Sequence, residues 1–261
     1  MPALEVLKFE DNNNEINPCF GAEAFQPIIQ TLYRRIGLQN LEKVLLQCRM
    51  SADLLAAFES SRSAKGLVAL VLRCDIGVEG ARALADVIGR NIFPALEMLL
   101  LYDNPRVSDE GAIVLAEALG NASRPFLRIL DLVNIGMCDR GMSALASLVR
   151  QGRLERLEEL NLSNNKGVTD NGIIALARAI EASGLPRLQH IRISKLDKMK
   201  VTTLRFGAIA YAIIKGSPQL RSINVECNEQ EAASLRTTIE GMLRAAGRTA
   251  SVKTEGSVVV T

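Results

Sequence analysis

LEELNLSNN at residues 157–165 and LEMLLLYDN at residues 96–104 share one pattern, L-x-x-L-x-L-x-x-N. Its apolar residues alternate with other residues around the fourth to sixth positions, which is typical of a strand with one buried face. Successive side chains of a strand point to opposite faces, so the leucines should point into the molecule. The residues between the leucines should then lie on an open surface.

The pattern recurs along the chain, with Ile, Val or Phe sometimes in place of Leu. Eight copies begin at Leu4, Leu41, Leu67, Leu96, Leu127, Leu157, Leu188 and Leu220. Successive copies start 26 to 37 residues apart, which is long enough for a strand and a full helix. We therefore predict an α/β solenoid of about eight units, curved, with parallel strands on its concave face and helices on its convex face. Residues 1–247 are assigned to the solenoid and residues 248–261 to a C-terminal tail or cap.

The second half of each unit supports a helix, because apolar residues there switch to helical spacing, as in TDNGIIALARAIEASG at residues 169–184. Ser51, Ser108 and Thr169 stand where a helix needs an N-cap. Gly66 and Gly184 stand where a helix should end.

Four units carry V-S/T-D-x-G or a near relative of it before the helix: VSDEG at Val107, VTDNG at Val168, IGVEG at Ile76 and MCDRG at Met137. With the strand pattern, this element resembles the ribonuclease-inhibitor-like class of leucine-rich-repeat proteins. That class includes the ribonuclease inhibitor, an activator of the nuclear-transport GTPase and sensor regions of innate immune receptors. F-box-associated repeats share the T-D-x-G element, but their units are shorter than most of these.

The resemblance also implies that residues at the strand exit stack inward and fix the backbone of the loop. Asparagines in that place are Asn12, Asn104, Asn165 and Asn228. Cys48, Cys74 and Cys227 lie one position earlier in their copies, where we expect small buried side chains.

The third, fifth and seventh residues of each copy should form the concave surface. Copies two to five place mainly apolar residues there, and copies six to eight place mainly polar ones. Contiguous apolar surface of this kind usually marks an interaction site. The candidate partner-binding residues are Leu45, Val71, Arg73, Met98, Leu100, Tyr102, Ile129, Asp131, Val133, His190 and Arg192. Two alternatives remain: apolar residues suit strands in general, and the tail, whose Val258–Val260 could form a strand, could cover the patch.

The sequence does not predict an enzyme. Its one histidine, His190, has no Ser or Cys nucleophile placed by the repeat to meet it. No C-x-x-C pair suggests a metal, and no glycine-rich phosphate-binding motif is present, so we expect no cofactor. The formal charge of +2 predicts no general attraction to nucleic acid or anionic lipid. The five cysteines do not form paired spacings, and no signal peptide or membrane span is expected, so we expect a cytoplasmic protein.

We therefore expect a module or scaffold that binds another protein through the concave strand face. The first copy begins at Leu4 without a cap before it, which predicts an open edge strand, a longer chain or a subunit of a larger assembly. One alternative is a GTPase-activating protein that uses Arg49, Arg73 or Arg106 near the strand exits, although the long acidic C-terminal segment of that family is missing. Another is the sensor portion of a larger receptor-like protein.

Overall fold

The structure is a computed structural model of the chain of 261 residues. It describes residues 6–10, 43–47, 65–122, 127–194, 203–224, 252–254 and 258–260, and the single residues 237, 240, 241 and 244. The predictions for Asn12, Cys48, Arg49, Ser51, Cys227 and Asn228 lie outside these residues, and so does the helix expected to end at Gly66.

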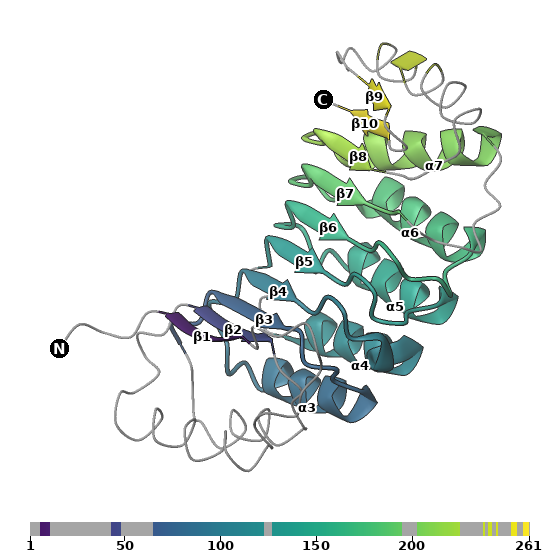
Figure 1. Ribbon diagram of the computed structural model, residues 1–261. Helices are drawn as coiled ribbons and strands as arrows, with labels where there is room; N and C mark the ends of the chain where they lie inside the picture. Colours follow the sequence, from purple (N-terminus) through teal and green to yellow (C-terminus); the bar gives the residue numbers. More distant parts are fainter. Residues whose placement is uncertain are drawn as a thin grey trace, which may run out of the picture.

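Strands and helices alternate along the chain and form two layers (Figure 1). One layer is a single sheet of eight parallel strands in sequential order: β1 (Val6–Glu10), β2 (Lys43–Gln47), β3 (Ala69–Leu72), β4 (Met98–Leu100), β5 (Ile129–Asp131), β6 (Glu159–Asn161), β7 (His190–Arg192) and β8 (Ser222–Asn224). The described helices of the other layer are α3 (Val78–Gly89), α4 (Ser108–Asn121), α5 (Asp139–Arg150), α6 (Asp170–Ser183) and α7 (Thr203–Gly216), with a 3-10 turn, η2 (Pro105–Val107), before α4. Each of the eight repeat copies contains one strand, so the predicted α/β solenoid is confirmed.

Neighbouring strands pair without any shift of register, so equivalent positions of the repeat lie side by side. Leu70 pairs with Leu99, Leu99 with Leu130, and Leu130 with Leu160. These leucines are at most 1% exposed and face the helices, where they form one continuous core. Burial of this row of leucines on one side fixes the opposite side of β3 to β6 as the outward one.

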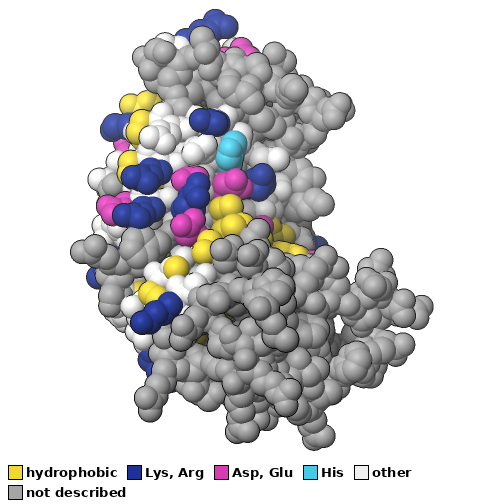
Figure 2. All heavy atoms as spheres, turned by 90° about the vertical axis from the view of Figure 1, so that its left-hand side faces the viewer, with side chains coloured by type: hydrophobic (Ala, Val, Ile, Leu, Met, Phe, Trp, Pro, Cys, Tyr) yellow, Lys and Arg dark blue, Asp and Glu magenta, His cyan; other side chains and the backbone are white. Residues whose placement is uncertain are grey.

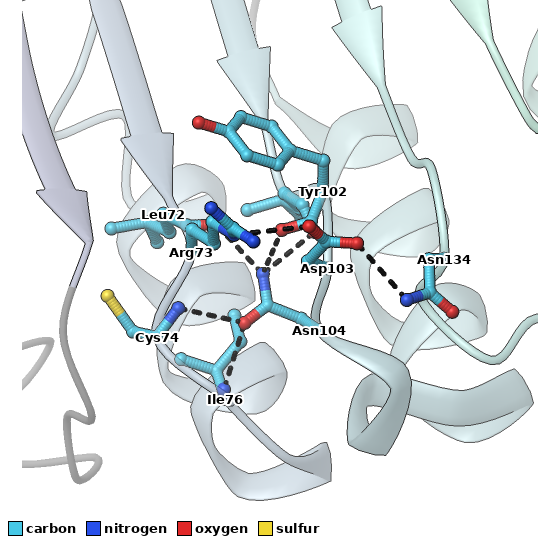
Figure 3. Close-up of polar contacts among 9 residues, drawn as sticks. Leu72, Arg73, Cys74, Ile76, Tyr102, Asp103, Asn104 and Asn134 are labelled. Atoms are coloured by element: carbon cyan, nitrogen blue, oxygen red, sulfur yellow. Dashed lines mark hydrogen bonds and ion pairs between the residues drawn. The ribbon is translucent and has the colours of Figure 1, made fainter. Parts of the chain in front are cut away.

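Buried asparagines connect successive units at the strand exits (Figure 3). The side chain of Asn104 donates to the carbonyls of Leu101, in its own unit, and Leu72, in the preceding unit, at 2.7 and 2.8 Å. Its Oδ1 accepts from the backbone N–H groups of Cys74 and Ile76 at 3.1 and 3.0 Å. The expected role of Asn104 is therefore confirmed, and Cys74 is buried as expected.

Asn165 repeats this arrangement one joint further along. It donates to the carbonyls of Leu132 and Leu162 at 2.8 Å and accepts from the N–H groups of Ile135 and Met137. Both asparagines are fully buried, so each one supplies hydrogen bonds that water cannot provide there.

The aspartate of the T-D-x-G element joins the units at the helix side. Oδ1 of Asp109 accepts from the N–H groups of Cys138 and Gly141, both at 2.7 Å, at the start of the next helix, α5. Asp139 does the same for Thr169 and Gly172 at the start of α6. A carboxylate at a helix N-terminus satisfies orphan N–H groups and interacts favourably with the helix dipole.

The glycine of this element is needed for space. A Cβ at Gly141 would lie 2.7 Å from Oδ1 of Asp109 and 2.7 Å from Cγ of Met137. The equivalent atom at Gly172 would lie 2.6 Å from Oδ1 of Asp139. The glycine of this element is therefore required by the lack of space, whereas Gly136 and Gly184, at φ 74° and 73°, lie in the left-handed region that favours glycine.

The predicted caps have mixed outcomes. Thr169 caps α6, because its side chain accepts from the N–H of Asn171, and Gly184 ends this helix. Ser108 is not an N-cap: η2 leads directly into α4, and Ser108 makes no capping hydrogen bond with its side chain. Its N–H donates instead to the carbonyl of Ile135 in the next unit.

The C-terminal residues described form a small hairpin of their own, in which β9 (Val252–Thr254) pairs antiparallel with β10 (Val258–Val260). Val258–Val260 thus forms the short strand expected from the sequence. β10 contacts β8, at the end of the array far from β2 to β5 (Figure 1). The hairpin therefore lies beside the last repeat and not over the strands of the apolar patch.

Replacing Asn165 with Ala should lower the free energy of unfolding by about 3 kcal/mol, because four buried backbone groups lose their partner. Asn171, exposed in the first turn of α6, offers the control: Asn171→Ala should change stability by less than about 0.5 kcal/mol. Urea unfolding followed by circular dichroism measures both. Equal effects of the two substitutions would contradict the role assigned to Asn165.

Gly141→Ala should destabilise the fold by roughly 2 kcal/mol, because the new methyl group meets a carboxylate and a buried methionine. Gly89 is the last residue of α3, and among the described residues no atom beyond its own stretch of helix lies within 4 Å of the place that a Cβ would occupy. Gly89→Ala should therefore be neutral or slightly stabilising. Thermal unfolding of the two variants distinguishes a loss of space from a general effect of replacing glycine.

Candidate functional site: the strand face

The candidate site is the outward surface of β3 to β7 together with the next outward residue after each strand, here called the strand face. These following residues are Arg73, Tyr102, Val133, Ser163 and Ser194. In β4, β5 and β6 the middle residue is buried and its neighbours are half-buried. Met98, Leu100, Tyr102, Ile129 and Val133 are all half-buried. The repeat thus orients these side chains as predicted, with part of each open to solvent. In the view of Figure 2, hydrophobic side chains lie directly beside charged ones on this side of the molecule.

Val71 departs from the expectation that it would be accessible, because it is only 9% exposed. Ala69, on the same face, is 3% exposed. In the sheet, Val71 lies in register between Leu45 and Leu100, two larger residues, and Ala69 lies between Lys43 and Met98. On the β4 side, the larger residues Leu100 and Met98 flank these two small side chains and help to shield them, although both occupy outward positions. Leu45 has its backbone in β2, and its side chain lies outside the described residues.

Arg73 and Tyr102 meet where β3 and β4 end (Figure 3). The Arg73 guanidinium lies 5.9 Å from the centre of the Tyr102 ring and 3.1 Å from a carboxylate oxygen of Asp103. Asp103 also accepts a hydrogen bond from Asn134 at 3.1 Å. These contacts hold the side chains of Arg73, Asp103 and Asn134 in place. The ring of Tyr102 lies at the border of the apolar residues of the strand face.

Asp131 is the carboxylate at the centre of the strand face. Oδ1 accepts from the N–H of Val133 at 3.0 Å, and Oδ2 accepts from the Asn161 amide at 3.2 Å. Burial raises its pKa above the ordinary value of an aspartate. The two hydrogen bonds and the charge of Arg192 act in the opposite direction, and the charge of Asp103 adds to the effect of burial.

His190 and Arg192 lie on β7, two strands away from β5, in the polar part of the strand face. Nδ1 of His190 is 2.6 Å from Oγ of Ser222, and Arg192 lies 3.8 Å from Glu159. At about 4.8 Å between strands, these residues are roughly 10 Å from the apolar ones. The structure therefore brings Met98, Leu100, Tyr102, Ile129 and Asp131 together and leaves His190 and Arg192 as a separate polar edge.

A row of ion pairs lies where β4, β5 and β6 begin, here called the strand entrances. It was not predicted from the sequence. Arg128 pairs with Glu97 at 3.2 Å and with both carboxylate oxygens of Glu158 at 2.9 Å. This contact raises the pKa of Arg128 and lowers that of Glu158. The sequence signal for it is the alternation of Glu, Arg and Glu at the second position of successive copies.

Two further features are absent from the part of the chain that the structure describes. Among those residues, no group of three or more His, Cys, Asp or Glu side chains is placed to hold a metal ion. Within the same residues, no helix has the length and apolar character to span a bilayer.

Replacing Asp131 with Asn should stabilise the fold at neutral pH, because burial disfavours the charged carboxylate. The pKa of Asp131 is higher in the folded chain than in the unfolded chain. The wild type therefore keeps its full stability at pH values below the pKa of the unfolded chain, and it loses part of that stability as pH rises through the pKa of the folded chain. The stability difference between Asp131→Asn and wild type should therefore grow with pH above about 4 and then level off. Urea unfolding at a series of pH values measures this difference, and a difference that shrinks with pH would contradict the assignment.

Comparison with known proteins agrees with this architecture. A family model described as Leucine Rich repeat matches residues 156–177, which contain β6 and the first part of α6. A search of curated proteins found no match to this chain. Among solved structures, the crystal structure of the Rad7 and Elc1 complex in yeast matches at 12% identity and a TM-score of 0.29, over 86% of this chain and 76% of that chain. So low a score supports no inference about a partner. The repeats, the parallel sheet with its helical layer and the family match together show that the chain is an α/β leucine-rich-repeat solenoid.

Proposed function

We propose that the chain is a non-enzymatic recognition module that binds another protein through the strand face. The observation that carries the proposal is the group of half-buried apolar side chains at Met98, Leu100, Tyr102 and Ile129, set side by side on β4 and β5. Tyrosine and methionine are well suited to such contacts, the first through its large amphipathic ring and the second through its flexible shape.

The polar edge of the same surface gives the partner a fixed orientation. Glu159, His190 and Arg192 continue the strand face beyond Ile129 and Asp131 without a break in the sheet. Apolar contact surrounded by hydrogen-bonding groups is the usual composition of a protein interface. The proposed binding surface therefore runs from β4 to β7.

The proposal includes four finer statements, on the repeat class, the location, the assembly and the kind of partner. We place the chain in the ribonuclease-inhibitor-like class, because the V-S/T-D-x-G element joins its units through Asp109 and Asp139. A cytoplasmic location fits the cysteine pattern, and a place in a larger assembly or longer chain fits a repeat array whose strand β1 is an edge of the described sheet. A protein partner fits the near-neutral charge better than nucleic acid or a membrane does.

GTPase activation receives no support from the described arginines. An activating arginine must reach a transition state in a partner's site. Arg73 is paired with Asp103, and Arg106 lies 3.5 Å from Asp75. Both arginines pair with carboxylates of their own chain, which favours a protein that binds its partner without activating a GTPase.

The double variant Leu100→Asp with Tyr102→Ala should abolish capture of a natural partner without unfolding the chain, since both side chains are half-buried on the outward face. Affinity capture from the native lysate, with mass spectrometry and circular dichroism, makes the comparison with wild type. The matched double variant Glu117→Asp with Arg178→Ala, at exposed positions of α4 and α6, should retain capture. Capture that survives the strand-face changes would contradict the proposed surface.

A further inference from the structure

The charges of the strand face are paired except at one place. Arg73 faces Asp103, and Arg192 faces Glu159. At the strand entrances Arg128 is held between Glu97 and Glu158. Asp131 takes part in none of the ion pairs among the described residues, and both of its hydrogen-bond donors, the Val133 N–H and the Asn161 amide, are uncharged.

The surroundings of Asp131 on the strand face are partly apolar. Leu100 is its register partner on β4, and Ile129 lies two residues earlier on the same face of β5. Both are half-buried and both belong to the proposed binding surface. A carboxylate beside exposed aliphatic groups matches a side chain that has an aliphatic stem and a positively charged head.

We propose that Asp131 recognises a lysine or arginine in the partner protein, whose aliphatic stem lies on Leu100 and Ile129. This inference rests on the proposed function, because it names the chemistry that the same surface prefers. The nearest cation of the chain on this row of the sheet, Arg192, lies two strands away and pairs with Glu159, so the partner's cation adds a countercharge in direct contact with Asp131. Charge-assisted hydrogen bonds in a partly dehydrated site are the stronger kind, so one such contact has a large effect on specificity.

Burial disfavours the ionised form of Asp131 in the free chain, and a bound cation favours that form. Binding should therefore lower the pKa of Asp131, and affinity should fall as pH is lowered through that pKa. The other charged groups that act on Asp131 are Arg192 on β7 and Asp103 after β4. His190, also on β7, is the same in wild type and in Asp131→Asn, so the comparison between these two proteins isolates the carboxylate of Asp131.

The test uses a random peptide library displayed on phage and selected against the full chain at pH 7. Peptides that bind the strand face are those whose binding is lost with Leu100→Asp. We expect these peptides to be enriched in lysine or arginine beside apolar residues. A selected peptide should bind Asp131→Asn roughly tenfold more weakly, and Glu117→Gln, which removes an exposed carboxylate from α4, should bind it like wild type.

A double-mutant cycle then connects the two charges. Replacing the peptide's basic residue with an uncharged isostere should weaken binding to wild type by roughly the same tenfold and should have little further effect on Asp131→Asn. Fluorescence anisotropy between pH 4 and pH 7 should show a loss of affinity at low pH that is absent in Asp131→Asn.

The outcomes separate this inference from the proposed function. Strand-face peptides that lack basic residues, or that bind Asp131→Asn as tightly as wild type, would overturn the role of Asp131 and leave the binding surface in place. Selection that gives only peptides insensitive to Leu100→Asp, or no peptide at all, would count against the surface itself.

Discussion

The array depends on side chains of one unit that satisfy backbone groups of a neighbouring unit. Asn104 and Asn165 fill the strand exits with hydrogen bonds to two successive loops, and Asp109 and Asp139 cap the helix of the following unit. A single unit would leave these buried N–H and C=O groups without partners, at a cost of about 1–3 kcal/mol each. Neighbouring units are therefore required for each one to fold, and the strands are held in one fixed register.

The joint between the units of β4 and β5 is built differently from its neighbours. Ile135 occupies the place in its copy that Asn104 and Asn165 occupy in theirs, so hydrogen bonds at this joint come from Asp109, Ser108 and Asn134 instead. A small apolar pocket of about 20 Å³ lies between the same two units, lined by leucines of both. Leu99 and Leu130, which line this pocket, alternate along β4 and β5 with the outward residues Leu100, Ile129 and Asp131 of the candidate site.

The sequence predicted the fold because the repeat sets the direction of every strand residue. The leucines at positions four and six had to be buried, and Leu99, Leu130 and Leu160 are. Accessibility was harder to predict, because it depends on the neighbours that register supplies: Val71, beside Leu100, is only 9% exposed, whereas Ile129, beside Glu159, stays half-buried. The T-D-x-G element was recognised as a pattern, but its aspartate acts on another unit about 30 residues away, a contact that no local rule reveals.

Asp131 does not fit the apolar character of the residues around it. The outward positions around it on β4 and β5 are apolar, and a leucine there would extend the patch without the cost of burying a charge. The chain instead has a carboxylate whose pKa is raised by burial and whose hydrogen bonds come only from neutral groups. Structural roles for half-buried aspartates are visible elsewhere in this molecule, at Asp109 and Asp139, and each of those accepts hydrogen bonds from two backbone N–H groups at the start of a helix. Asp131 accepts a hydrogen bond from one backbone N–H, in its own loop, which is too little to explain a charge at that position. Residues that do not suit their local surroundings are concentrated at functional sites.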